Sequence, residues 1–397
     1  MNRKLSMIIF YVDIALMLIF ILSRWQVRIT LNGDESATAA LGHEYVDMGA
    51  TATFTGRDIH AFDGDVKVRV NAKHVDTDTP GTYTVTYKAS RLFWSDKAER
   101  TVTVVDDNPP VLSLGEVNTY IDGGGEWTDN YSAMDDRDGN LTSQVVVSGN
   151  LDLSRVGLYE IDYSVTDSSG NTATASREVR VIGTDQPVTG SKIVFLTFDD
   201  GPWDATDELL DVLAKHNVKV TFFVTANHPE YIDCIGREFR EGHTVAVHTY
   251  THDFDQVYAS SDAYWSDFER MNDVIAEQCG GYRSIIFRFP GGASNTISSF
   301  NPGIMTRLTQ EAVDKGLDYF DWNVDCGDGG GLNDTPQLYQ NIINGIAAND
   351  ISVVLCHDTH TATVRAIDDV LTWGEQNGYT FLPLGKGMYT CHHSVAN

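Results

Sequence analysis

The spacing of apolar and polar residues divides the chain into three regions. Residues 7–22 are almost continuously apolar and follow two basic residues, Arg3 and Lys4. Residues 27–183 carry short alternating runs, such as GTYTVTYKAS and GLYEIDYSVTD, between turn signals. From residue 192 onward, short apolar runs alternate with longer amphipathic stretches. The three patterns predict a transmembrane helix, antiparallel β-strands and an α/β domain, in that order.

The first apolar region has the length of an uncleaved membrane anchor. Extended slightly at each end, it reaches the roughly 17 to 25 residues needed to cross a bilayer. No small-residue cleavage site of the A-x-A kind follows it, although a cleaved signal peptide with an unusual site stays the alternative. Asp13 within the span and two arginines after it weigh against an anchor. We expect residues 1–26 to form a cytoplasmic tip and a single transmembrane helix in the cell membrane, with the rest of the chain extracellular.

The alternating region contains one unit twice. Gly81 and the two tyrosines that follow it recur about 76 residues later, beginning at Gly157. Alternation with a period of two is typical of half-buried antiparallel strands. A tandem repeat of this length, built of strands and turns, predicts two all-β immunoglobulin-like sandwiches, over residues 27–107 and 108–184. They resemble the immunoglobulin-like modules of bacterial cell-surface proteins and would serve as a spacer.

The last region repeats a strand followed by a helix about seven times in roughly 200 residues. One amphipathic stretch, SDAYWSDFERMNDVIAEQCG, begins with capping residues and ends with glycine, as a helix should. Parallel strands joined by crossover helices predict a distorted (β/α)7 barrel similar to a TIM barrel, over residues 190–397. In such barrels the chemistry lies at the carboxyl ends of the strands.

Net charge and cysteine spacing argue against some classes of partner and of structural site. The chain has 28 Lys and Arg against 56 Asp and Glu, a formal net charge of -28, which argues against nucleic acid. Five cysteines without C-x-x-C spacing indicate neither a zinc ribbon nor a dense disulfide framework. Cys234 and Cys279 could pair, but small buried apolar side chains are the favoured interpretation.

Polar clusters follow several predicted strands of the barrel. Asp199 and Asp200 end the first strand, and His248 and His252 follow another with i, i+4 spacing. Two imidazoles and a carboxylate make a site with open positions for a borderline divalent ion. Histidine pairs arise often by chance, but the neighbouring acid pair favours a metal site. Arg288 ends a further strand, where it would hold one of the carboxylates ionised.

Two more clusters lie towards the carboxyl terminus. Asp321 and Trp322 end one predicted strand, while Asp325 and Asp328 read as turn residues. His357 ends another apolar run and could be a structural residue, a third metal ligand or a general acid. A lone Trp in this place is more often packing than a sugar platform.

Five segments, TFDDGP, HTYTH, RFPGG, DW and LCH, occur in this order at predicted strand ends. Together they resemble the five motifs of the polysaccharide deacetylase family, carbohydrate esterase family 4, also called the NodB homology domain. The resemblance covers about residues 190–390. TFDDGP combined with H-x-x-x-H is far more specific than either motif alone.

The resemblance implies a role for each matching residue. The metal would be Zn²⁺, with Co²⁺, Ni²⁺ or Fe²⁺ as alternatives. Gly291 stands where many members have Tyr, and the oxyanion donor there is a main-chain N–H. The implied roles are metal ligands Asp200, His248 and His252; general base Asp199, paired with Arg288; general acid His357, oriented by Asp321; and pocket residues Trp322, Leu355 and Gly291.

The implied reaction is hydrolysis of the N-acetyl group of N-acetylglucosamine in a cell-surface glycan, releasing acetate. Peptidoglycan is the expected substrate because an extracellular catalytic domain would face it. Chitin oligosaccharides, an exopolysaccharide or acetyl-xylan are alternatives, as are a non-catalytic wall-binding or adhesion protein and a different metal hydrolase on this barrel. In the β-modules, Asp135, Asp136 and Asp138 could bind calcium, but a solvated turn is favoured for so few ligands.

Overall fold

The computed structural model describes residues 3–22, 24–57, 60–117, 119–122 and 127–397. The chain divides into two compact units, each assembled from several stretches of sequence. The first unit comprises Met1–Ser113, Tyr131–Val146 and Ser164–Ala175; the second comprises Leu114–Asn130, Val147–Tyr163 and Ser176–Asn397.

Helix α1 spans Arg3–Leu22. Within the residues that the structure describes, no helix is both long enough and apolar enough to cross a membrane. The transmembrane helix expected over residues 1–26 is not found among the residues described there; residues 1, 2 and 23 lie outside them.

The first immunoglobulin-like module consists of two sheets. One has the order β1-β3-β4 and the other the order β2-β7-β6-β5. The longest pairing is antiparallel, between β6 and β7, and apolar side chains alternate along both strands as the period of two predicts. The bounds are β1 Trp25–Leu31, β2 Ser36–Ala40, β3 Ala50–Gly56, β4 Gly64–Asp65, β5 Val68–Asn71, β6 Gly81–Arg91 and β7 Trp94–Val105.

The second module again has two sheets, ordered β11-β10-β8 and β12-β13-β14-β9. The expected all-β modules are thus present in both copies. The bounds are β8 Val111–Leu114, β9 Tyr120–Asp122, β10 Tyr131–Asp135, β11 Gly139–Asn140, the 3-10 helix η1 Thr142–Gln144, β12 Val146–Ser148, β13 Gly157–Thr166 and β14 Thr172–Gly183.

The same contact recurs in both modules: a buried Tyr donates a hydrogen bond from its hydroxyl to an Asp. In the first copy the Tyr87 hydroxyl donates to Asp47 Oδ2 over 2.6 Å, and Arg100 Nη1 lies 2.9 Å from the same oxygen. In the second copy Tyr163 donates to Asp129, which also accepts from an arginine. The tyrosine hydroxyls would otherwise be buried without partners, so the pattern recurs with the fold.

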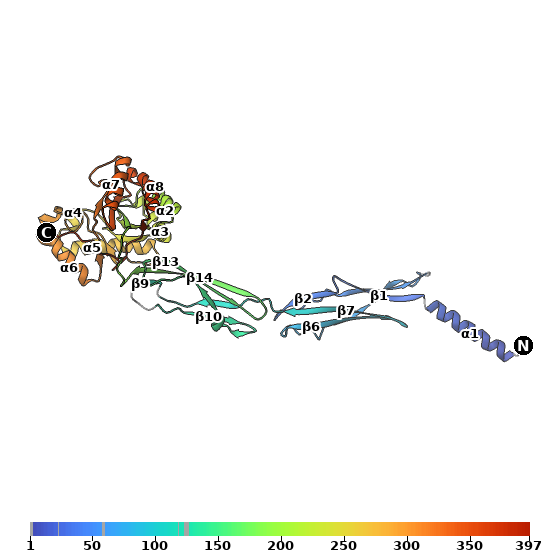
Figure 1. Ribbon diagram of the computed structural model, residues 1–397. Helices are drawn as coiled ribbons and strands as arrows, with labels where there is room; N and C mark the ends of the chain where they lie inside the picture. The colour runs from blue at the N-terminus through green and yellow to red at the C-terminus, as the bar shows by residue number, and fades with distance from the viewer. Residues whose placement is uncertain (1–2, 23, 58–59, 118, 123–126) are drawn as a thin grey trace. The chain divides into compact units, whose positions relative to one another are not determined.

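The α/β domain is built on one parallel sheet. Its strand order is β19-β18-β17-β16-β15-β21-β20, with β22 beside β15, which fits the expected distorted (β/α)7 barrel (Figure 1). The strands are β15 Ile193–Asp199, β16 Thr221–Val224, β17 Thr244–Val247, β18 Ile286–Phe287, β19 Asp318–Tyr319, β20 Val324–Asp325, β21 Ile351–His357 and β22 Thr380–Phe381.

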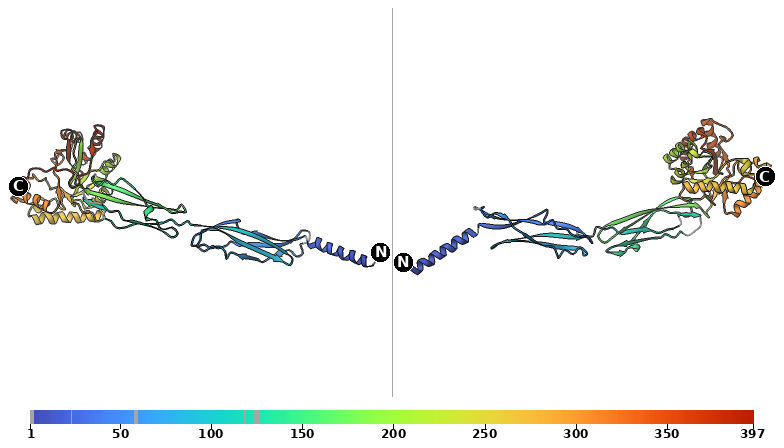
Figure 2. Two further views of the ribbon diagram at one scale, coloured as in Figure 1. Left: turned by 60° about the horizontal axis from the view of Figure 1, so that its bottom comes forward. Right: turned by 180° about the vertical axis from the view of Figure 1, so that it is seen from behind.

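Helices surround this sheet (Figure 1). Helix α5 contributes Tyr264, Phe268, Met271 and Ile275 to the core, the face that its apolar spacing predicts. It is the long helix beside the sheet in both views of Figure 2. The helices are α2 Thr206–Lys215, α3 Asp233–Arg240, α4 Phe254–Val257, α5 Ser261–Gln278, α6 Ile304–Asp314, α7 Thr335–Ala347 and α8 Thr361–Gln376, with 3-10 helices η2 Pro229–Tyr231 and η3 Ile297–Phe300.

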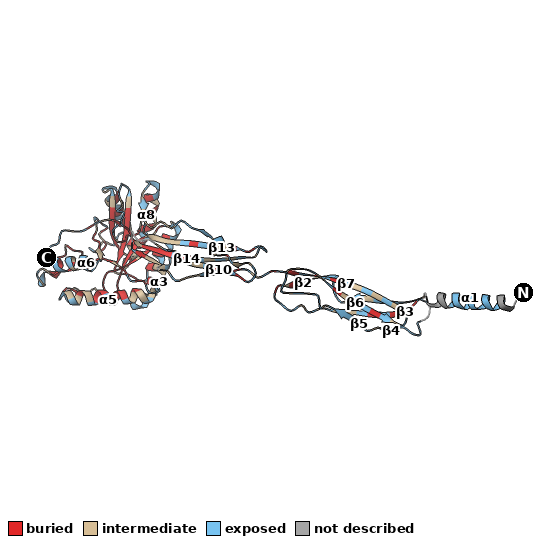
Figure 3. Cartoon of the chain, turned by 90° about the horizontal axis from the view of Figure 1, so that it is seen from below, coloured by how far each residue is buried: buried red, intermediate tan, exposed pale blue. Residues whose placement is uncertain are grey.

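The barrel strands are buried on both faces, which explains why they are apolar runs without alternation. In β15, the side chains of Val194, Leu196 and Phe198 belong to the core between the sheet and the helices. The side chain of Phe195 belongs to a second core cluster, on the other face of the strand. The buried strands stand out against the exposed outer faces of the helices in Figure 3. All five cysteines are free, so Cys234 and Cys279 do not pair.

Within the second unit, the end of β14 packs against the barrel. The Arg180 guanidinium carbon lies 3.6 Å from the centroid of the Phe239 ring, and Arg180 Nη1 donates to the carbonyl of His243 over 3.1 Å. Gly183, the last residue of β14, forms a β-bridge with Lys386. Part of the second module and the barrel therefore form one compact unit.

Candidate active site

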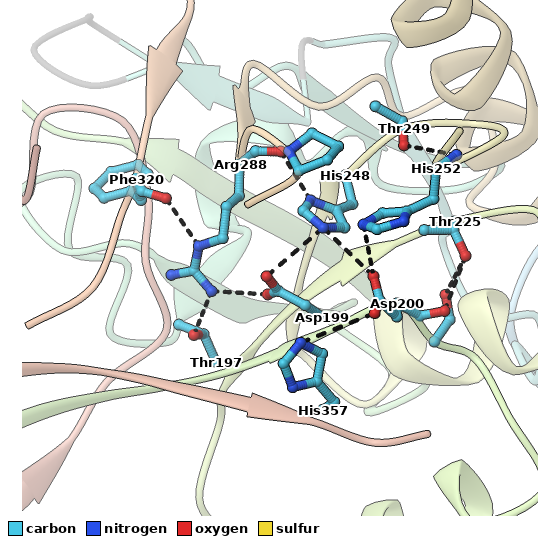
Figure 4. Close-up of polar contacts among 12 residues, drawn as sticks. Thr197, Asp199, Asp200, Thr225, His248, Thr249, His252, Arg288, Phe320 and His357 are labelled. Carbon is cyan, nitrogen blue, oxygen red and sulfur yellow. Dashed lines mark hydrogen bonds and ion pairs between the residues drawn. The ribbon is translucent and has the colours of Figure 1, made fainter. Parts of the chain in front are cut away.

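The polar residues predicted at the strand ends meet at one edge of the parallel sheet. Asp199 ends β15 and lies in register with His357 at the end of β21. His248 and Arg288 follow the paired ends of β17 and β18. Figure 4 shows these side chains converging above the carboxyl ends of the strands. The parallel topology thus gathers groups that are far apart in the sequence.

Asp199 is held by a buried arginine. Arg288 Nη1 lies 2.7 Å from Asp199 Oδ1 and also donates to the Thr197 hydroxyl over 2.8 Å. Its Nε donates to the carbonyl of Phe320 over 2.8 Å, and its Nη2 to the carbonyl of Asp321 over 3.0 Å. With its donors engaged, the planar guanidinium is fixed, and it compensates the charge of the buried carboxylate. Asp199 and Arg288 thus form a buried ion pair.

Asp200 turns away from its neighbour towards the two histidines. Its Oδ1 lies 3.4 Å from His248 Nε2 and 3.3 Å from His252 Nε2 (Figure 4). The backbone makes this turn at a positive φ of 72° at Asp200, and His252 also has a positive φ of 48°. Such conformations are unfavourable for side-chain-bearing residues and cluster at functional sites.

These three residues fit a divalent metal ion. One ligand atom from each of Asp200, His248 and His252 lies within 4.8 Å of the others. Asp200 Oδ1 is buried and has no hydrogen-bond partner, which is costly unless a cation binds it. His248 Nδ1 donates to the Arg288 carbonyl over 2.8 Å, so its Nε2 is left with a lone pair directed at the site. Burial lowers the pKa of His248 and favours the neutral, ligating form.

His357 lies near the second carboxylate oxygen of Asp200, the one that does not face His248 and His252. Its Nε2 lies 3.9 Å from Asp200 Oδ2, while its Nδ1 lies 2.7 Å from Oδ1 of the fully buried Asp328. Burial alone would lower the pKa of His357, but the hydrogen bond and negative charge of Asp328 outweigh it and raise the pKa to about 10. The same hydrogen bond, assisted by Thr363, lowers the pKa of Asp328 to about 2 despite its burial. The contact favours a protonated imidazole beside an ionised carboxylate.

Asp321 does not orient His357, contrary to the expectation. Its carboxylate accepts hydrogen bonds from the N–H groups of Ala293 and His393, over 2.8 and 2.7 Å. It thereby connects the loop after Arg288 to the carboxyl-terminal segment.

Asp328, interpreted from the sequence as a turn residue, is the partner of His357. Strand β20 pairs with β21, so the acid that follows β20 lies close to the residue that ends β21. The strand-end argument applied to residues 324–325 would have found it. The strand has only two residues, however, and a glycine-rich loop follows it.

The predicted pocket residues lie around this edge. Leu355, buried in β21, precedes His357 by two residues, so both point to the same face of the strand. The Trp322 ring lies 5.6 Å from the Arg288 guanidinium carbon. Gly291 is exposed and has a positive φ of 72°. Gly329 was not predicted, yet a Cβ added there would lie 2.9 Å from His357 Cε1.

Comparison with known proteins agrees with this geometry. The family model described as polysaccharide deacetylase matches residues 186–300, and the model described as bacterial surface protein, Ig-like domain, matches residues 29–104 and 113–181. A Bacillus cereus protein named peptidoglycan-N-acetylglucosamine deacetylase is 34% identical over 197 residues, which cover 48% of this chain and 68% of the relative. A chitin deacetylase of Arthroderma benhamiae is 35% identical over 179 residues, covering 44% of this chain and 45% of the relative.

A solved structure resembles the barrel more closely. The catalytic domain of peptidoglycan N-acetylglucosamine deacetylase from Eubacterium rectale is 48% identical, with a TM-score of 0.52, and the match covers 53% of this chain and 97% of that domain. The Bacillus cereus relative is matched over more than two thirds of its length. The chain therefore belongs to the polysaccharide deacetylase family of hydrolases, with immunoglobulin-like modules of the bacterial surface type preceding its deacetylase domain.

Proposed function

We propose that the protein is a metal-dependent deacetylase that removes the N-acetyl group from N-acetylglucosamine residues of peptidoglycan. The observation that carries the proposal is the unpartnered Oδ1 of Asp200, which lies between two histidines and beside a carboxylate already held by an arginine. In this proposal the metal ligand, the base and the acid are three separate groups at one edge of the sheet.

Asp200, His248 and His252 would hold the metal ion, and their ligand types suit Zn²⁺ as well as Co²⁺, Ni²⁺ or Fe²⁺. When bound, such an ion lowers the pKa of water and polarises the carbonyl of the acetamide. Three protein ligands are the number typical of catalytic zinc sites, which keep a position open for water or substrate.

Asp199 is placed to act as the general base. Arg288 occupies its Oδ1, and its Oδ2 lies 3.8 Å from His248 Nε2, on the side of the proposed metal ligands. The free oxygen would accept a proton from the water that attacks the acetyl carbon. Holding one oxygen also fixes the direction in which the other points.

His357 is placed to act as the general acid. Asp328 keeps its imidazole protonated, and its Nε2 faces Asp200 across the site. Nε2 would donate its proton to the glucosamine nitrogen as the C–N bond breaks, so that a neutral amine leaves rather than an unstable anion. The N–H of Gly291 is the proposed main-chain donor to the oxyanion. The products are acetate and a free amino sugar.

Peptidoglycan is the proposed substrate because both the Bacillus cereus relative and the Eubacterium rectale catalytic domain are named for it. The module model, described as belonging to bacterial surface proteins, supports an extracellular location. There the first module would act as a spacer.

Acetate release and mass spectrometry of glycan fragments test the proposal. The full chain, loaded with Zn²⁺, should release acetate from purified peptidoglycan, with the loss of one acetyl group per modified residue. Chitin oligosaccharides and acetyl-xylan serve as parallel substrates. Faster turnover of either would reassign the substrate but keep the deacetylase. Binding of glycan without acetate release from any of the three would contradict the enzyme and favour a wall-binding protein.

A further inference from the structure

Three acidic side chains are buried together at one end of the second immunoglobulin-like module. Asp106 follows β7, Asp135 ends β10 and Asp167 follows β13, and they are 8%, 7% and 7% exposed. One carboxylate oxygen from each lies within 4.8 Å of the others. We call these residues the module cluster. All three belong to the first compact unit.

Local hydrogen bonds orient the carboxylates of the module cluster. Asp135 Oδ1 accepts from the N–H groups of Arg137 and Asp138, over 2.9 and 2.7 Å. Asp167 Oδ1 accepts from the N–H groups of two residues in its own turn. Asp106 Oδ2 accepts from the hydroxyl of Ser169 over 3.0 Å. The other oxygens of Asp106 and Asp167 also accept hydrogen bonds, from the Asn108 N–H and from the Asn171 side chain.

Asp135 Oδ2 is the exception that points to a ligand. It is buried and has no hydrogen-bond partner. Arg137 is a cation near the cluster: its Nη1 lies 3.8 Å from Asp106 Oδ2, and its side chain is 39% exposed. One partly solvated guanidinium at that distance does not compensate three buried carboxylates. A positive charge next to Asp135 Oδ2 would.

We propose that the module cluster binds a divalent cation, Ca²⁺, through Asp106, Asp135 and Asp167. The cluster offers only oxygen ligands, which hard cations prefer, and Ca²⁺–O bonds of about 2.3–2.6 Å allow oxygens as far apart as these. Water would complete the six to eight ligands that Ca²⁺ takes. The expected dissociation constant is about 10⁻⁴–10⁻³ M, the range for extracellular modules.

This site differs from the calcium site considered in the sequence analysis, which combined Asp135 with Asp136 and Asp138. Asp136 and Asp138 have other partners: Asp136 Oδ2 accepts from the Asn108 side chain, and Asp138 accepts from Ser168. Asp135 instead meets two acids that are 29 or more residues away along the chain. A bound cation would fasten Asp106, the first residue after β7, to two loops of the second module.

Calorimetric titration and thermal unfolding of the full chain test the site. The chain is first dialysed against chelator and then titrated with Ca²⁺, with Mg²⁺ in parallel. The variant is Asp135→Asn, and the matched control is Asp107→Asn, which removes an exposed acid from the same segment. The barrel site is identical in all three proteins, so a difference between them reports on the module cluster.

We expect Ca²⁺ to raise the melting temperature of the wild type and of Asp107→Asn equally. Asp135→Asn should bind Ca²⁺ about tenfold or more weakly, and its melting temperature should rise less than that of the control. If Asp135→Asn does not fold, Asp167→Asn is measured instead. The proposal is overturned if about 10 mM Ca²⁺ neither binds nor stabilises the wild type, or if the variant responds as fully as the control.

Discussion

His357 Nδ1 lies 2.7 Å from Asp328 Oδ1, and this contact raises the pKa of the His357 imidazole. Burial of an imidazole favours its neutral form, so a His357 without a partner would lose its proton. Asp328 reverses that preference and raises the pKa of His357 to about 10.

Asp328→Asn should therefore move the basic limb of the pH profile to lower pH. Without the carboxylate, the pKa of His357 falls and the acid is deprotonated earlier as pH rises. We expect kcat near neutral pH to fall by about 10²-fold or more, the usual contribution of a general acid. Asp325→Asn, which alters an exposed acid at the end of β20, three residues before Asp328, is the control. A basic limb that stays in place in Asp328→Asn would show that Asp328 does not set the protonation of His357.

The division of labour between the adjacent acids can be tested with two identical substitutions. Asp199→Asn should keep the metal and lose about 10²–10⁴-fold in kcat, because only the base is removed. Asp200→Asn should bind the metal about tenfold or more weakly, because a ligand is lost. Bound zinc is counted by elemental analysis alongside acetate release. Equal metal loss in both variants would contradict separate roles.

Substitution of Asp321 should lower the stability of the fold, whereas substitution of Asp328 should lower the pKa of His357. Asp321→Asn leaves the buried N–H of Ala293 and the partly buried N–H of His393 with a weaker or misdirected acceptor, so we expect a loss of about 1–3 kcal/mol in the free energy of unfolding. The pKa of His357, followed by NMR of its ring, should stay raised. A fall in that pKa comparable to the effect of Asp328→Asn would restore Asp321 as the residue that orients His357.

Glu238 in α3 should make stability depend on pH. Both of its carboxylate oxygens are buried without a partner, and burial together with nearby Asp358 raises its pKa well above 4.5. A raised folded-state pKa means that the stabilising contribution is complete below about 4.5, the ordinary value, and is lost as pH rises through the folded value.

Urea unfolding at pH 5 and pH 8 measures this effect. The free energy of unfolding should fall between these pH values in the wild type and fall less in Glu238→Gln. Glu230→Gln, at an exposed position, should behave as the wild type. A wild-type slope that Glu238→Gln leaves unchanged would mean that other groups cause it.

The sequence places the proposed ligands, the proposed base and Arg288 at this edge of the sheet, because each follows an apolar run that is recognisable as a strand. The sequence does not place Asp328 beside His357, because Asp328 lies three residues beyond the end of β20, in a glycine-rich loop. The module cluster could not be predicted either, since its three acids lie in different loops and only the folded sandwich brings them together. The residue types alone were recognisable in the sequence, but contacts between residues far apart along the chain were not.

The contact of Arg180 with Phe239 has a consequence for how such proteins are rearranged in evolution. An exchange of domains at the linker near residues 184–190 would separate this arginine from the ring and carbonyls that receive it. An exchange near residue 108 would leave the contact intact. We expect natural shuffling to add or remove modules on the amino-terminal side, so that the second module and the barrel are inherited together.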